Sequence, residues 1–207
     1  MHLTNAILNA VANLVLLVGL PFLGYWLYHK LRHRRTFAEI TRRAGLHLGE
    51  GRYILYCLAF AAVVVAVLLI WPPPLEPFLR KGSAQQSFVG LGLNATAITM
   101  ALLYGVVKTG FAEEFLFRGL IAGSLGRRLS LPWANVWQAL IFLLPHLALL
   151  FIMPEMWWIQ ILVFGSALFT GWVRIRSGSI VGPWLAHAAA NVAMCLSVAA
   201  RTANMPC

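Results

Sequence analysis

Gly110-Phe-Ala-Glu-Glu-Phe-Leu-Phe-Arg-Gly-Leu120 is the stretch that decides how this chain folds, because it sets two adjacent carboxylates inside an apolar run. Arg118 follows Glu114 by four residues, and on a helix that spacing allows an ion pair. Ionisable groups are costly in hydrocarbon, so those found inside a membrane span indicate a functional site. We expect Glu114 to pair with Arg118, which leaves Glu113 free to face a cavity.

The composition surrounding this stretch is that of a membrane protein. The chain has 207 residues, of which 60% are hydrophobic and only 11% are charged, whereas soluble domains carry about 25% charged residues. Six apolar stretches are separated by short polar or proline-containing turns. We therefore predict an all-α fold, a polytopic transmembrane helical bundle with about six spans, as a single transmembrane domain over residues 1–207.

The predicted spans divide the chain into two parts. Residues 1–87 form an N-terminal two-span region with a basic loop, and residues 88–200 form the core that bears the glutamates. The expected spans cover residues 6–28, 53–71, 88 onward through the two glutamates, 133–152, 157–173 and 180–200.

The formal net charge of +10 is concentrated in short loops between the spans. This pattern is the positive-inside signature of membrane proteins, and we therefore expect no nucleic-acid partner. The loop His29–Arg52 is predicted to be cytoplasmic, with the protein in the cell (inner) membrane as a multi-pass protein. Arg174 and Arg176 are expected to close the fifth span on the same side.

Two histidines lie deep within spans, His146 in the fourth and His187 in the sixth. Asn191 follows His187 by four residues, so both side chains point from one face of a helix. Phe142 precedes His146 by the same spacing. Histidine and asparagine inside a membrane also serve as hydrogen-bonding residues between helices, which is the structural alternative to a catalytic role.

The three motifs, each in a separate span, resemble those of one family of membrane enzymes. The order Glu113-Glu114-x-x-x-Arg118, Phe142-x-x-x-His146 and His187-x-x-x-Asn191 is similar to that of the CAAX-protease and Abi (CPBP) family of glutamate-dependent intramembrane endopeptidases. The resemblance covers roughly residues 90 to 200.

The resemblance implies a role for each polar side chain. Glu113 would activate a water molecule together with His146, and Glu114 with Arg118 would orient these groups. A further pair of side chains would stabilise the oxyanion of the tetrahedral intermediate, a role that preorganised donors can fill. This pair is His187 and Asn191.

The expected activity is hydrolysis of a peptide bond in a membrane-associated protein or peptide, such as a leader peptide or a C-terminal sorting segment. No cofactor is expected, although one glutamate and two histidines could hold Zn²⁺, which remains an alternative. The expected partners are the substrate and the lipid bilayer, and the sequence assigns no oligomeric state.

Other mechanisms lack their residues. The chain has no aspartate for an aspartyl protease, no His-Glu-x-x-His helix and no Gly-x-Ser-Gly nucleophile. Two non-peptidase alternatives stay open: a catalytically idle membrane scaffold or immunity protein with the same fold, and a proton-coupled transporter, against which the absence of a visible inverted repeat argues.

Overall fold

The computed structural model describes residues 2–205, whose regular elements are all helices, with no strand among them. Six helices are long and apolar enough to cross a membrane, so the predicted all-α bundle with six spans is confirmed. These helices are Leu3–His33, Gly51–Ile70, Ala95–Leu125, Leu131–Phe151, Trp158–Ser177 and Val181–Arg201.

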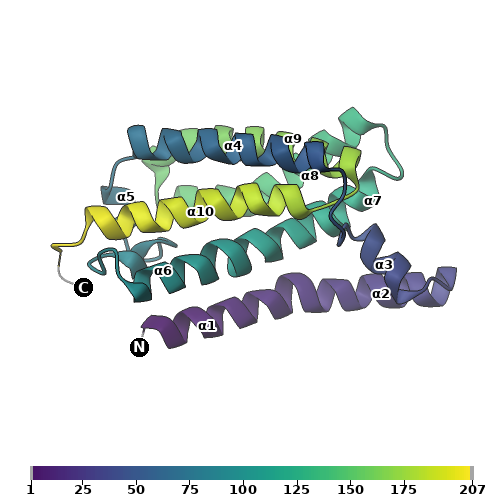
Figure 1. The fold of residues 1–207 in the computed structure, drawn as a ribbon, viewed down its shortest axis with the longest axis horizontal. Coiled ribbons are helices and arrows are strands. Elements are labelled where there is room, and N and C mark those ends of the chain that lie inside the picture. The colour runs from purple at the N-terminus through teal and green to yellow at the C-terminus, as the bar shows by residue number, and fades with distance from the viewer. Residues whose placement is uncertain (1, 206–207) are drawn as a thin grey trace.

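The six spans alternate in direction, so both termini lie at the same end of the bundle (Figure 1). The short helices α3 (Phe37–Arg43) and α7 (Gly123–Leu125) lie at the opposite end, while α5 (Glu76–Leu79) lies at the end that holds the termini. The last helix, α10 (Val181–Arg201), packs between α4 (Gly51–Ile70) and the third span.

The first span is longer than the sequence indicated. It consists of α1 (His2–Asn13), a π-helical segment η1 (Leu14–Gly19) and α2 (Leu20–His33). The loop was expected to begin at His29, but it begins five residues later, at Arg34. Arg34 adopts a left-handed conformation (φ 51°) and ends the helix. Thr36 then begins α3 through a capping box, in which its backbone N–H donates to the Glu39 carboxylate over 2.8 Å.

The third span begins at Ala95 and not at residue 88, which corrects the predicted boundary. Gly90 and Gly92 have positive φ angles of 77° and 66°, so the chain turns there and does not continue as a helix. Asn94 then caps the new helix, because its side-chain oxygen accepts a hydrogen bond from the Ala97 N–H over 2.9 Å.

The third span is wound more widely than an α-helix on both sides of Glu113. It contains α6 (Ala95–Leu102), followed by the π-helical segments η3 (Leu103–Phe111) and η4 (Glu114–Ala122). Such segments are rare and occur frequently at functional sites.

The third span and α10 come close together at Gly105. A Cβ atom at this position would lie 2.6 Å from Cγ2 of Val192 and 2.8 Å from its backbone nitrogen. Only glycine allows the two backbones to come this close, as in other small-residue contacts between membrane helices. This packing turns one face of α10 towards the segment that carries the two glutamates.

Candidate active site

A buried ion pair lies at the centre of the site. Arg118 Nη1 is 3.1 Å from Glu114 Oε1, and the two side chains are 2% and 1% exposed. The predicted pairing at a four-residue spacing is therefore confirmed. Because removing charges from water is costly, such a pair needs further hydrogen bonds to satisfy its remaining atoms.

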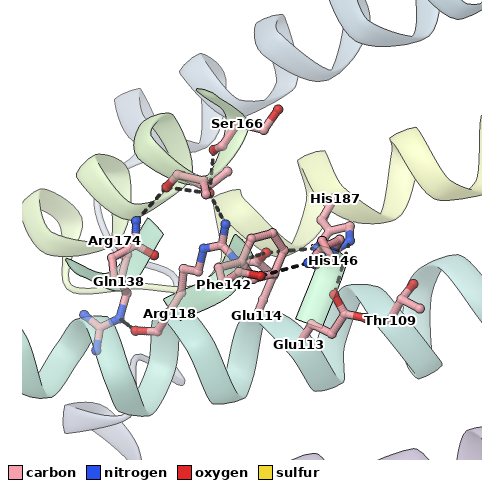
Figure 2. A network of polar contacts seen from close by, with 12 residues as sticks. Thr109, Glu113, Glu114, Arg118, Gln138, Phe142, His146, Ser166, Arg174 and His187 are labelled. Carbon is pink, nitrogen blue, oxygen red and sulfur yellow. Dashed lines mark hydrogen bonds and ion pairs between the residues drawn. The ribbon is translucent and has the colours of Figure 1, made fainter. Parts of the chain in front are cut away.

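His187 supplies one of these hydrogen bonds from α10. Its Nδ1–H donates to Glu114 Oε1 over 2.9 Å, which places its Nε2 towards the neighbouring glutamate (Figure 2). Glu113 Oε2 lies 3.9 Å from that Nε2. The distance is too long for a direct hydrogen bond but suits a bridging water, and the two side chains keep 19% and 17% exposure.

His146 lies in the last turn of α8 (Leu131–Leu147), directly after Pro145. Its Nδ1–H donates to the Phe142 carbonyl oxygen over 2.8 Å, which leaves Nε2 available as a proton acceptor when the ring is neutral. Glu113 and His187 lie near enough to act on this imidazole electrostatically. Three of the predicted site residues, from three spans, are thus brought together (Figure 2).

The Phe142 ring connects the ion pair to both imidazoles. The Arg118 guanidinium lies over this ring with its Cζ 3.9 Å from the centroid. The centroid of the His146 ring is 4.4 Å away and that of His187 is 6.2 Å away. The sequence placed Phe142 one turn before His146 but assigned it no contact with the ion pair.

Asn191 is held at the edge of the site by a residue that the sequence interpretation missed. Its Nδ2 donates to Thr109 Oγ1 over 2.8 Å, and the Thr109 hydroxyl donates in turn to the Tyr104 carbonyl oxygen over 2.9 Å. One of the two amide N–H groups of Asn191 remains for another acceptor. A threonine four residues before Glu113, within an apolar span, was the available signal.

The fifth span, which the sequence did not assign to the site, also supports Arg118. Thr170 of α9 (Trp158–Ser177) accepts a hydrogen bond from Arg118 Nη2 over 2.8 Å. Arg174 of the same helix donates from Nε to the Arg118 carbonyl oxygen over 3.0 Å. Arg174 lies in the last turn of this span, as the sequence indicated, and the structure buries it to 4% exposure, which the sequence did not indicate.

The arrangement of the site's histidines and glutamates can be compared with that of a metal site. Within residues 2–205, no group of three or more His, Cys, Asp or Glu side chains has a geometry that could hold a metal ion. Glu114 Oε1 is already engaged by Arg118 and His187.

Comparison with known proteins finds one family that the site-bearing part of the chain resembles. Residues 94–193 match the family described as type II CAAX prenyl endopeptidase Rce1-like, and this range contains the six residues of the predicted site. The chain has no significant match among curated proteins or among solved structures.

Proposed function

We propose that the chain, whose residues 94–193 match the Rce1-like family of type II CAAX prenyl endopeptidases, is an intramembrane endopeptidase. One observation carries the proposal. The Glu113 carboxylate faces Nε2 of His187 across 3.9 Å, with His146 nearby, inside a bundle of apolar spans. A water molecule beside this gap, in contact with both groups, is the proposed nucleophile.

Glu113 and His146 are proposed to activate that water. A carboxylate or a neutral imidazole within hydrogen-bond reach of a water can take its proton as a general base. The water oxygen then bonds to the carbonyl carbon of the substrate, while its proton passes to Glu113. When the carbon–nitrogen bond breaks, the same proton is delivered to the leaving amine, so that a carboxylic acid and an amine are released.

His187, as an imidazolium whose Nε2–H is free after Nδ1–H donates to Glu114, and Asn191 are proposed to donate to the negative oxygen of the intermediate. The Glu114 carboxylate fixes the His187 ring, and Thr109 fixes the Asn191 amide, so both groups are positioned before the reaction. Preorganised donors of this kind supply one of the largest contributions to acyl-transfer catalysis. Glu114 and Arg118 are positioning residues in this mechanism.

The substrate class follows from the location of the site. The spans make the chain a multi-pass membrane protein, so its substrates are proposed to be membrane-associated proteins or peptides, including leader peptides and C-terminal sorting segments. The end of the bundle that carries α3 is proposed to be cytoplasmic, in the cell (inner) membrane, because it bears most of the basic residues. No cofactor is required by the proposed steps.

The test is a Glu113→Gln substitution, which removes the base but keeps the size of the side chain. Membrane proteomes of cells with the unmodified chain and with the variant are compared for precursors that stay uncleaved in the variant. Glu76→Gln is the matched control, because Glu76 is an exposed glutamate of α5. Precursor accumulation in the Glu113 variant alone supports the peptidase, and unchanged processing in a correctly inserted Glu113 variant refutes it.

A further inference from the structure

A basic pocket of about 430 Å³ lies at the end of the bundle that holds α3 and α7, away from the proposed active site. It is bounded by α3, the loop that leads to α4, the end of the third span and the last turn of α9. Its charged lining, which we call the arginine pocket, consists of five arginines and one glutamate: Arg35, Arg42, Arg43, Arg127, Arg174 and Glu39.

The positive charge of the arginine pocket has no sufficient counterion. Five arginines face one glutamate, and Glu39 is already occupied by the capping box, where it accepts hydrogen bonds from the Thr36 N–H and hydroxyl. Nε atoms of Arg35 and Arg43 are buried without a hydrogen-bond partner among the described residues. A buried donor without an acceptor destabilises the fold, so this arrangement favours an anion in the pocket.

Arg174 is the buried and preorganised arginine of the pocket. Its side chain is 4% exposed, yet it forms no ion pair with a carboxylate of residues 2–205, and it donates only to backbone carbonyls. Two glycines make room for it: a Cβ at Gly123 would lie 2.6 Å from its Nη2, and one at Gly45 would lie 3.0 Å from its Nε. A buried guanidinium with neutral partners leaves charge available for an anion at the pocket wall.

We propose that the arginine pocket binds a phosphate-bearing anion. Guanidinium groups are suited to phosphate because they offer paired N–H donors in a planar fork. The pocket lies where spans end, at the level expected for lipid headgroups, and clusters of arginine at this level attract anionic lipids. The headgroup of an anionic phospholipid and a free phosphate share this chemistry.

Occupancy of the arginine pocket is expected to stabilise the segment behind the active site. Arg174 donates to the carbonyl oxygens of Arg118 and Gly119 in η4 and of Arg43 in α3. An anion that holds the Arg174 guanidinium would therefore fasten α3 to η4. The proposal does not depend on the peptidase assignment, because its measurement is the stability of the folded chain.

The experiment follows thermal unfolding of the full chain, purified in a neutral detergent, while one component is added. The additions are phosphatidylglycerol, phosphatidylcholine, and inorganic phosphate compared with chloride at equal ionic strength. The variant Arg35→Gln/Arg42→Gln removes two charges that line the pocket. Its matched control, Arg128→Gln/Arg176→Gln, removes two exposed charges that do not line it.

Phosphatidylglycerol is expected to raise the unfolding temperature where phosphatidylcholine does not, with about tenfold weaker apparent binding in the pocket variant and unchanged binding in the control. If inorganic phosphate raises the unfolding temperature, with weaker binding in the pocket variant, and phosphatidylglycerol has no effect, the ligand is a soluble phosphate compound. Equal loss in both variants, or no stabilisation by either anion, would overturn the proposal. A pocket variant with a native unfolding temperature before addition shows that the fold is intact.

Discussion

Arg118 lies over the face of Phe142, with 3.9 Å between its Cζ and the ring centroid, while it also pairs with Glu114. The ring is thus placed between the guanidinium and the two imidazoles of the site. Cation–π contacts that are removed from water contribute about 2 kcal/mol or more. An apolar residue is therefore part of the electrostatic arrangement of the site.

Replacing Phe142 with leucine is expected to lower both stability and cleavage. The variant loses the cation–π contact and part of the packing, at a cost of about 1–3 kcal/mol in the free energy of unfolding. Phe142→Tyr keeps an aromatic face and serves as the control. Thermal unfolding and cleavage of a substrate precursor are measured together, and equal behaviour of the two variants would contradict a special role for the ring.

Breaking the buried ion pair on one side is expected to be more severe. Glu114→Gln or Arg118→Met leaves an uncompensated buried charge, which costs about 3–5 kcal/mol. The double variant carries neither charge, so its unfolding temperature should lie above that of either single variant. Cleavage should stay low in the double variant, because His187 has lost the carboxylate that fixes its ring. Additive losses of stability would show that the two charges do not interact.

Thr109 is expected to matter for catalysis through Asn191. Thr109→Val removes the oxygen that accepts the amide hydrogen bond, so the donor loses its fixed orientation, and kcat should fall by about tenfold or more with little change in KM. Thr109→Ser keeps the hydroxyl and should retain most of the activity. Steady-state kinetics on both variants make the comparison, and a valine variant with unchanged kcat would remove Asn191 from the proposed oxyanion site.

Acidification is expected to loosen the loop between α3 and α4. Burial lowers the pKa of His47 below its usual 6.5, nearby Arg42 and Arg174 add to this effect, and a backbone contact with Gly178 opposes it. The neutral ring is favoured in the fold, so its stabilising contribution is complete above pH 6.5 and is lost as the pH falls through the lowered value. Hydrogen exchange of residues 44–50 should therefore accelerate below pH 6.5, after correction for intrinsic rates. The same profile in a His47→Gln variant would contradict the assignment to this imidazole.

Cleavage is expected to persist after treatment with a strong chelator. The proposed steps use a carboxylate and imidazoles alone, and Glu114 is already engaged by an arginine and a histidine. The measurement is the rate of precursor cleavage before and after chelation, followed by addition of Zn²⁺. Loss of activity that Zn²⁺ restores would replace the proposed water activation by a metal-dependent one.

The sequence predicted the features that depend on local spacing. Six apolar stretches indicated six spans, and the four residues between Glu114 and Arg118 indicated their ion pair. The boundary at Asn94 was missed because Gly90 and Gly92 lie in an apolar stretch, where hydropathy hides the change in backbone direction. The periodicity of a sequence reports which side chains are apolar, whereas the start of the third span is set by the backbone φ angles of Gly90 and Gly92.

Features that depend on contacts between distant helices could not be derived from spacing. Thr109 meets Asn191 across 82 residues, and Arg174 meets Arg118 across 56. The charge of Arg174 suggested the end of a span, where it lies, but its burial depends on carbonyl oxygens of η4 and α3 that spacing does not reveal. The π-helical winding beside Glu113 was also missed, because prediction from an α-helical period assumes a uniform turn.

The absence of a side chain at Gly105 has an evolutionary consequence. The spacing of the third and sixth spans is limited there by one hydrogen atom facing Val192, and the same two spans carry Glu113 and His187. Positions 105 and 192 should therefore change only in concert among descendants that keep the chemistry. A larger residue at position 105 alone would increase the distance between Glu113 and His187, so selection should remove it. Neither position 105 nor position 192 is proposed to touch the substrate.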